Sequence, residues 1–133
     1  MNKMLLSISL VLLMTGAANA QSVILNPTKV QFTASADHSI TIGGVALVER
    51  YELRHYVVGS TTPVSVVNMG KPTPDALNTI VFTFAALPFS TTTQYFARVV
   101  AIGSTGEGVS ANSSETYFFA GSPGSPGTVA VKK

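Results

Sequence analysis

Two histidines and a few scattered carboxylates are the side chains that could support acid–base chemistry or bind a metal ion. Asp37 and His38 are adjacent, whereas His55 and Glu107 lie apart from them in the sequence. A protein metal site normally requires three or four ligands held by further hydrogen bonds. No third ligand accompanies the Asp37–His38 pair, so we expect solvated loop residues there and predict neither a metal site nor a cofactor.

The segment 48–58 has the two-residue period of a strand with one buried face. Tyr51, Leu53 and His55 share one parity, which predicts that His55 lies at the margin of the core rather than in a catalytic site. Glycoside hydrolysis needs two suitably placed carboxylates. Glu49 and Glu52 have opposite parity, and Glu52 instead shares its face with two arginines, so we expect a ladder of ion pairs there.

Nucleophilic and phosphate-binding motifs are missing from the sequence. The chain has no cysteine and no Gly-x-Ser-x-Gly motif. The glycine-rich segment 103–108 lacks the Lys-Ser/Thr ending of a phosphate loop, so a hairpin is favoured. These observations favour a protein that is not an enzyme. A small secreted hydrolase, with a site assembled from Asp37, His38, His55 and Glu107, stays open as the less favoured alternative.

Charge and cysteine content restrict the partners and the means of stabilisation. The 133 residues include 8 Lys and Arg and 6 Asp and Glu, with a formal net charge of +2. Lys132 and Lys133 form the only basic cluster, so the electrostatic pattern of a nucleic-acid-binding protein is missing. Without cysteine, a small exported domain must be stabilised by its packed core rather than by disulfides.

The first residues have the pattern of a secretory signal peptide. Lys3 precedes a short apolar run, residues 4–14, and Ala18-Asn19-Ala20 forms a small-x-small cleavage site. We therefore expect removal of residues 1–20 and a secreted, periplasmic or cell-surface location. No later segment approaches the ~20 apolar residues of a membrane-spanning helix, so no transmembrane anchor is expected in the mature chain.

Short alternating segments separated by turn residues predict an all-β fold in the mature chain. We expect one domain, residues 21–120, followed by a flexible Gly/Ser/Pro linker and tail, residues 121–133. A short extension at 39–42 is also expected. The seven predicted strands are residues 23–25, 29–35, 48–58, 64–67, 79–85, 94–102 and 114–120.

The predicted strand at 94–102 gives the strongest indication of the fold. Tyr95 begins a row of inward positions that continues with Ala97, Val99 and Ala101. A tyrosine opening such a strand after a turn-rich corner is a feature of immunoglobulin-like sandwiches. In that arrangement we expect the Tyr95 hydroxyl to bond to the backbone near residues 90–92.

Five motifs occur in an order typical of one family of β-sandwich domains: Tyr51-x-Leu53, Ile80-x-Phe82-x-Phe84, Leu87-Pro88, Thr93-x-Tyr95-x-Ala97-x-Val99-x-Ala101 and Gly106-x-Gly108. Together they resemble a fibronectin type III domain over residues 26–120. The resemblance implies an immunoglobulin-like, seven-stranded antiparallel β-sandwich, and domains of this family commonly serve as adhesion modules and spacers. The sequence departs from the family in lacking tryptophan, for which Phe32 is the best substitute, and in the long stretch 36–47, whose topology stays open.

On the predicted strands 48–58 and 94–102, the side chains that point away from the core form a candidate binding face, which we call the outer face. Arginine with aromatic and aliphatic side chains is the composition enriched at interface hot spots. A crowded sheet surface held by cross-strand pairs is the alternative. We therefore expect an exported recognition or spacer module that binds a protein or carbohydrate, or else a structural domain of a cell-surface or virion assembly. The outer face comprises Arg50, Arg54, Tyr56, Phe96, Arg98, Val100 and Ile102.

Overall fold

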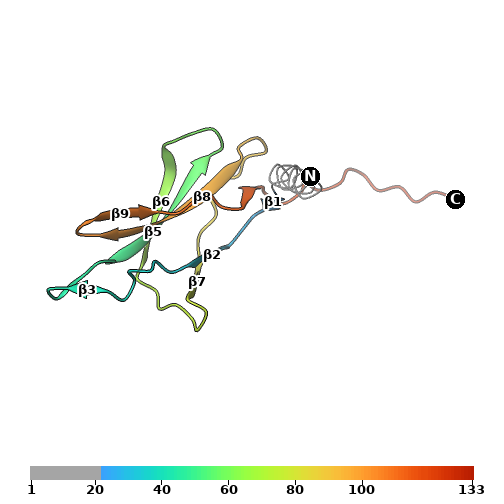
Figure 1. Cartoon of the computed structure of the whole chain (residues 1–133). Helices are drawn as coiled ribbons and strands as arrows, with labels where there is room; N and C mark the ends of the chain where they lie inside the picture. Colours follow the sequence, from blue (N-terminus) through green and yellow to red (C-terminus); the bar gives the residue numbers. More distant parts are fainter. Residues whose placement is uncertain (1–21) are drawn as a thin grey trace, which may run out of the picture.

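The computed structural model describes residues 22–133, and within this range the chain forms strands and loops but no helix. This confirms the all-β prediction. Figure 1 shows an elongated molecule from one end of which the C-terminal segment projects. The strands are β1 (Ser22–Leu25), β2 (Lys29–Thr33), β3 (Thr41–Ile42), β4 (Val45–Ala46), β5 (Arg50–Val57), β6 (Pro63–Gly70), β7 (Thr79–Thr83), β8 (Tyr95–Gly103), β9 (Gly106–Val109) and β10 (Glu115–Phe118).

The larger sheet has the strand order β1-β10-β8-β5-β6, with β9 paired to the far end of β8. Its centre is the antiparallel pair β5–β8, which runs from Arg50 opposite Ile102 to Val57 opposite Tyr95. Both strands begin within two residues of their predicted positions. Because side chains alternate across a strand, this pair presents one row to the core and the other to the outer face.

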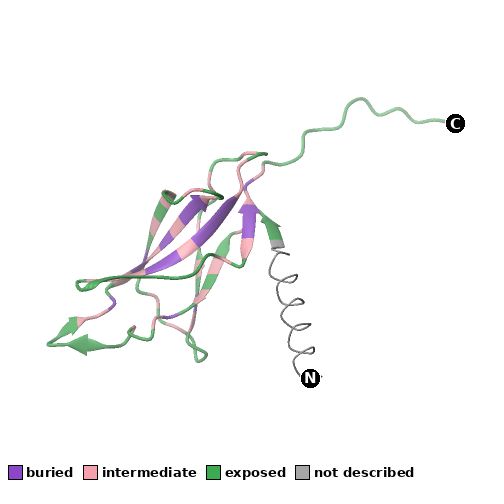
Figure 2. Cartoon of the chain, turned by 45° about the horizontal axis from the view of Figure 1, so that its top comes forward, coloured by how far each residue is buried: buried purple, intermediate pink, exposed green. Residues whose placement is uncertain are grey.

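A second, two-stranded sheet covers the inner row. β2 and β7 run antiparallel, with Phe32 opposite Ile80. Ile80 packs with Leu53 of β5 and with Phe119, which follows β10, and these three side chains are at most 2% exposed. Figure 2 shows the buried residues concentrated along the central strands of the larger sheet. The core therefore lies between two facing sheets and contains no disulfide.

Residues 36–47, whose topology the sequence left open, form an arm that projects from the body (Figures 1 and 2). Its strands β3 and β4 pair across a two-residue turn at Gly43 and Gly44, where φ is 60° and 81°. Both positions need the left-handed conformation of a type I′ turn, which glycine adopts readily. Ile42 and Val45 remain exposed on this arm.

Residues 22–133 form ten strands where the sequence predicted seven. The hairpin favoured for the glycine-rich segment 103–108 is confirmed, and its second arm is β9, whose Gly106–Val109 backbone pairs with β8. Glycine is unfavourable in strands, yet here β8 supplies an aligned ladder of backbone partners. The sequence did not predict β4, which forms by pairing with β3 across the turn at Gly43 and Gly44, or the full length of β6, which is extended by pairing with β5.

β1 departs from the predicted antiparallel arrangement, because it pairs with β10 in parallel. Asn26 holds the two strands together at their C-terminal ends. Its backbone N–H donates to the Phe118 carbonyl oxygen at 2.9 Å, and its side-chain amide exchanges hydrogen bonds of 2.8 and 3.0 Å with the Ala120 backbone. Residue preferences indicate a strand but not its partner, so the sequence did not reveal this pair.

The expected hydrogen bond of Tyr95 is not formed. Within the described residues, no partner lies within hydrogen-bonding distance of its hydroxyl, although the ring is buried and stacks against Tyr117 at 6.0 Å between centroids. The corner near Ser90 is closed instead by the Ser90 N–H, which donates to the Phe119 carbonyl oxygen at 2.8 Å. The tyrosine therefore contributes ring packing, and the backbone and serine hydrogen bonds shape the turn.

Residues 121–133 have no regular secondary structure and are exposed throughout. They leave the body after Ala120, whose backbone is bonded to Asn26. The predicted signal peptide, residues 1–20, lies outside the described residues. No helix in residues 22–133 is long and apolar enough to span a bilayer.

Candidate functional site

The pairing of β5 with β8 brings the predicted outer-face residues together. Arg54 lies opposite Arg98, Tyr56 opposite Phe96, and Arg50 opposite Ile102, while Val100 faces Glu52. The fold therefore places all seven residues on one face of two neighbouring strands. Whether this face binds a partner stays a prediction.

An aromatic stack with an arginine over it forms one end of the outer face. The rings of Tyr56 and Phe96 are nearly parallel, with an interplanar angle of 7° and centroids 5.0 Å apart. The Arg98 guanidinium carbon lies 5.4 Å from the Tyr56 centroid and 5.8 Å from that of Phe96. Its Nε donates to Asn112 Oδ1 at 2.7 Å. Cation–π attraction and this hydrogen bond fix the arginine over the rings.

An ion-pair network forms the other part of the outer face. Arg54 lies 2.8 Å from the Glu52 carboxylate and 3.1 Å from that of Glu107, while Arg50 lies 3.8 Å from Glu52. This confirms the expected pairing of Glu52 with both arginines. The hydrogen bonds to Glu52 and Glu107 raise the pKa of Arg54. These carboxylates also offset the repulsion between Arg54 and Arg98, which lie directly opposite one another.

The exposed apolar surface lies on the flanking strands β6 and β9 rather than on the aromatic stack or the ion-pair network. Tyr56 is 5% exposed, and Val100 is fully buried. Val64 and Val66 on β6 and Val109 on β9 are at least half exposed. Val66 is the partner of Arg54 and Val109 that of Val100, so these valines continue the outer face on both sides. The sequence alone did not single out these valines, because which strands flank β5 and β8 is known only from the fold.

His38 is tied to the inner side of β5. Its Nδ1 lies 2.7 Å from the Tyr51 hydroxyl, and the two rings stack with centroids 5.7 Å apart. The same hydroxyl accepts a hydrogen bond of 3.2 Å from the Ser35 N–H. Burial, and then the charge of Lys71, lower the pKa of His38. The half-buried His38 therefore fastens the segment after β2 to the larger sheet, which corrects the expectation of a solvated loop residue.

His55 is buried more deeply than the sequence suggested. It is 1% exposed, and its Nδ1 lies 2.6 Å from the Tyr117 hydroxyl. Its ring also packs against Phe84 and Phe119, and its Nε2 has no hydrogen-bond partner within the described residues. Burial lowers the pKa of His55 to about 4, so the imidazole is neutral at pH 7.

The four residues of the hydrolase alternative are not assembled into one cluster. Asp37 and Glu107 line the same open cavity of about 240 Å³, but His38 and His55 are not among its lining residues. Each histidine is bonded to a different tyrosine. No group of three His, Asp or Glu side chains in residues 22–133 is placed to hold a metal ion.

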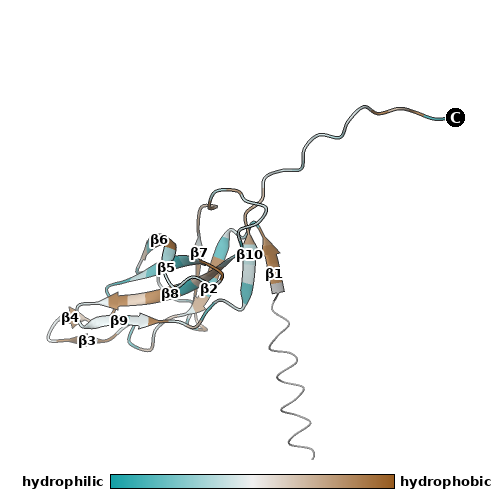
Figure 3. Cartoon of the chain, turned by 90° about the horizontal axis from the view of Figure 1, so that it is seen from above, coloured by the Kyte–Doolittle hydropathy of each residue, from teal (hydrophilic) through white to brown (hydrophobic). Residues whose placement is uncertain are grey.

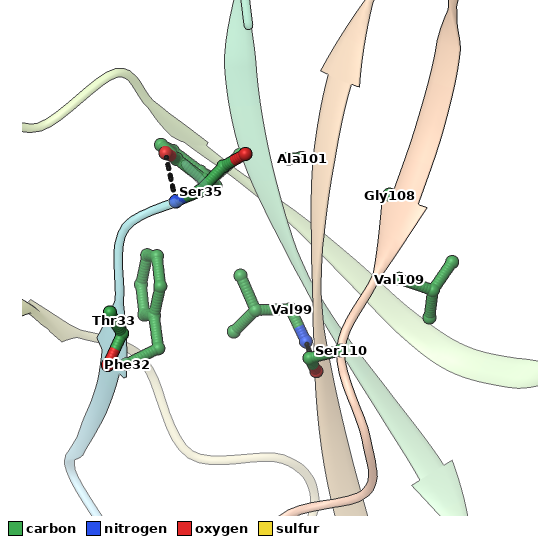
Figure 4. Close-up of a pocket in the computed structure, with 9 residues that line it drawn as sticks. Phe32, Thr33, Ser35, Val99, Ala101, Gly108, Val109 and Ser110 are labelled. Atoms are coloured by element: carbon green, nitrogen blue, oxygen red, sulfur yellow. Dashed lines mark hydrogen bonds between the residues drawn. The ribbon is translucent and has the colours of Figure 1, made fainter. Parts of the chain in front are cut away.

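Two larger cavities follow β2 where it faces the larger sheet. One, of about 410 Å³, lies between β2 and the β8–β9 hairpin. Figure 4 shows Phe32 and Val99 approaching it from opposite sides, with Val109 directed away. The other, of about 430 Å³, lies between the start of β2 and β10 and includes Val30, Ala97 and Tyr117 in its lining.

Comparisons of the sequence with models of protein families, with curated proteins and with solved structures each found no match.

Proposed function

We propose that this chain is an exported, non-enzymatic recognition module that binds a protein partner through the outer face of β5, β8 and the flanking strands. The observation that carries the proposal is the fixed Arg98–Tyr56–Phe96 stack, bordered by exposed valines on β6 and β9. Interface hot spots are enriched in arginine and are surrounded by contacts that exclude water, and here the covered Tyr56 and Phe96 rings hold Arg98 in place beside the exposed valines. A stack already ordered in the free domain would lose little side-chain entropy on binding.

A protein partner fits this face better than a carbohydrate. Sugar rings stack on free aromatic faces, but Tyr56 and Phe96 stack on each other and are covered by Arg98. Both rings are at most 9% exposed. The accessible apolar groups are valines on a sheet surface, which suit the side chains of another protein.

We also propose a fibronectin type III-like arrangement for the domain, and export by cleavage after Ala20. In support of the arrangement, the path β10-β8-β5-β6 faces the pair β2-β7, with the core between them. Adhesion and spacer roles would agree with a packed domain followed by an exposed Pro/Gly-rich segment.

The experiment compares the mature chain, residues 21–133, with the Val66→Glu and Val81→Glu variants. Val66 lies on the outer face and Val81 on β7, and they are 50% and 54% exposed. Each protein is cross-linked in the extracellular or envelope fraction of its source, and captured proteins are identified by mass spectrometry. Denaturant titration checks that both variants stay folded.

We expect a captured protein that binds the mature chain and the Val81→Glu variant equally, and binds the Val66→Glu variant at least about tenfold more weakly, because a charge would be placed in the contact. If both variants lost binding to the captured protein equally, or if neither lost any, the outer face would not be the binding site.

A further inference from the structure

The smaller sheet lacks a strand over part of the larger one. β2 pairs only with β7 among the described residues, whereas the facing sheet continues past β8 to β9, β10 and β1. The uncovered inner surface forms the two cavities along β2, of about 410 and 430 Å³. A third strand beside β2 would cover both.

The backbone of β2 has an open edge that faces this space. The Phe84 N–H donates to the Thr28 carbonyl oxygen, and the Ala34 N–H donates to that of Asn78, each at 2.9 Å. Even-numbered residues of β2 therefore bond toward β7, because hydrogen-bonded and non-bonded pairs alternate in an antiparallel ladder. The N–H and C=O groups of Lys29, Gln31 and Thr33 point to the opposite edge, where no strand of residues 22–133 pairs.

The C-terminal tail, residues 128–133, has the pattern of a strand without a sheet. Its sequence TVAVKK places Val129 and Val131 at one parity, and they are 84% and 96% exposed. Figures 1 and 3 both show this segment clear of the two sheets. β-branched residues at alternate positions favour a strand with one buried face.

We propose that this tail adds to the open edge of β2 as a parallel strand of the same molecule. In the register that places Ala130 beside Gln31, Val129 lies next to Val30 and Val131 next to Phe32. Both valines then face the cavities, because neighbouring residues of paired strands point to the same side. Lys132 and Lys133 reach the end of β2 nearest Asp37, which lines an open cavity together with Glu107.

The spacer, residues 121–127, is suited to bringing the tail back to the edge of β2. The chain leaves Ala120 bonded to Asn26, close to where β2 begins at Lys29. The Asn26 N–H donates to the Phe118 carbonyl oxygen at the end of β10, so the tail leaves β10 near the start of β2 and must turn there to enter the open edge. Two prolines and three glycines within the spacer favour such a turn. Seven residues span up to about 24 Å, more than two strand spacings.

The same molecule is the favoured source of the strand. A short flexible spacer gives the tail an effective concentration in the millimolar range, which a second copy in solution rarely reaches. Occupation would also protect an edge that otherwise invites strand pairing between copies.

The absence of cysteine allows a direct test by disulfide trapping. The first variant combines Gln31→Cys with Ala130→Cys, which lie on adjacent strands about 5 Å apart in the proposed register. The control combines Val81→Cys with Ala130→Cys. Val81 is the β7 partner of Gln31, so it lies one strand further away and beyond disulfide reach. Mature proteins are oxidised and analysed by non-reducing electrophoresis and peptide mapping.

We expect a disulfide within the monomer in the first variant, with a yield at least about tenfold above that of the control and independent of protein concentration. Dimers that increase with concentration would identify a second copy as the donor and overturn the proposal. Equal yields in the two variants, or no disulfide, would also overturn it.

Two further variants test whether the disulfide forms because the tail is docked on β2 or because the two cysteines collide at random. In the first cysteine variant, the double change Val129→Asp and Val131→Asp should reduce the yield to the control level, because it would bury two charges. Thr128→Asp, whose side chain points outward in the same register, should leave the yield unchanged. Persistence of the disulfide with both valines replaced would contradict the proposal.

Discussion

The Nδ1 atom of His55 lies 2.6 Å from the hydroxyl oxygen of Tyr117, and both side chains are buried in the core. This bond links β5 to β10, which are separated by β8 in the larger sheet. The imidazole Nε2 has no hydrogen-bond partner in residues 22–133, so His55 depends on Tyr117 for its only polar contact there. The pair therefore connects β5, at the centre of the sheet, to β10, the last strand in the sequence.

Replacing Tyr117 by phenylalanine should lower the free energy of unfolding by about 1–3 kcal/mol, since it leaves a buried ring nitrogen without a partner. Tyr95→Phe is the matched control, because Tyr95 stacks on Tyr117 but makes no hydrogen bond in the described residues. We expect its cost to stay below about 1 kcal/mol. Denaturant titration measures both, and an equal cost would indicate a hydrogen bond from Tyr95.

Stability should fall as the pH decreases from 6.5 toward 4. Burial lowers the pKa of His55 in the folded protein from 6.5 to about 4. In this interval the unfolded chain binds a proton that the folded protein does not, so acid favours unfolding. The contribution of His55 amounts to on the order of 3 kcal/mol across the whole interval.

The measurement is the free energy of unfolding between pH 5 and 6.5, where carboxylates contribute little. In His55→Phe the slope should decrease by up to about 1.4 kcal/mol per pH unit at the lower end. A smaller slope should remain, because the pKa of His38 is also lowered. An unchanged slope in His55→Phe would show that the folded protein tolerates a charged His55.

Gly103→Ala should destabilise the domain by about 1–3 kcal/mol through overpacking. A Cβ at this position would overlap the carbonyl oxygen of Leu47. The neighbouring backbone cannot easily retreat, because the Glu49 N–H donates to the Ile102 carbonyl oxygen at 2.7 Å. Gly108→Ala is the control, since its Cβ would meet no atom within 4 Å. Equal melting temperatures for the two variants would contradict this close approach.

Asn26 is expected to stabilise the junction of β1, β10 and the tail in two separable ways. Its φ of 52° would strain most other residue types at this position, and its side chain forms two hydrogen bonds with Ala120. Asn26→Gly removes only the bonds, whereas Asn26→Ala removes the bonds and adds strain. Thermal denaturation should therefore rank Asn26→Ala below Asn26→Gly by about 1 kcal/mol, with both below the parent. Equal stability of the two variants would mean that the backbone relaxes.

On the outer face, the alternation of residues along a strand predicts the side of each side chain but not its exposure. Alternation along β5 and β8 correctly grouped Arg54, Tyr56, Phe96 and Arg98, because a regular strand fixes the side of each residue. The exposure of these residues was not predictable in the same way. Tyr56 and Phe96 are covered through contacts with each other and with Arg98, which depend on the register between two strands.

The amino-acid sequence by itself determined the all-β class, the central strands and the direction of their side chains, because these follow from local alternation and turn residues. Only the tertiary structure decided that β1 pairs in parallel with β10, that each histidine has a tyrosine partner, and that β2 has an open edge. These features depend on contacts between residues far apart in the chain. Backbone pairing energies differ little among partners, so packing of the whole domain selects between them.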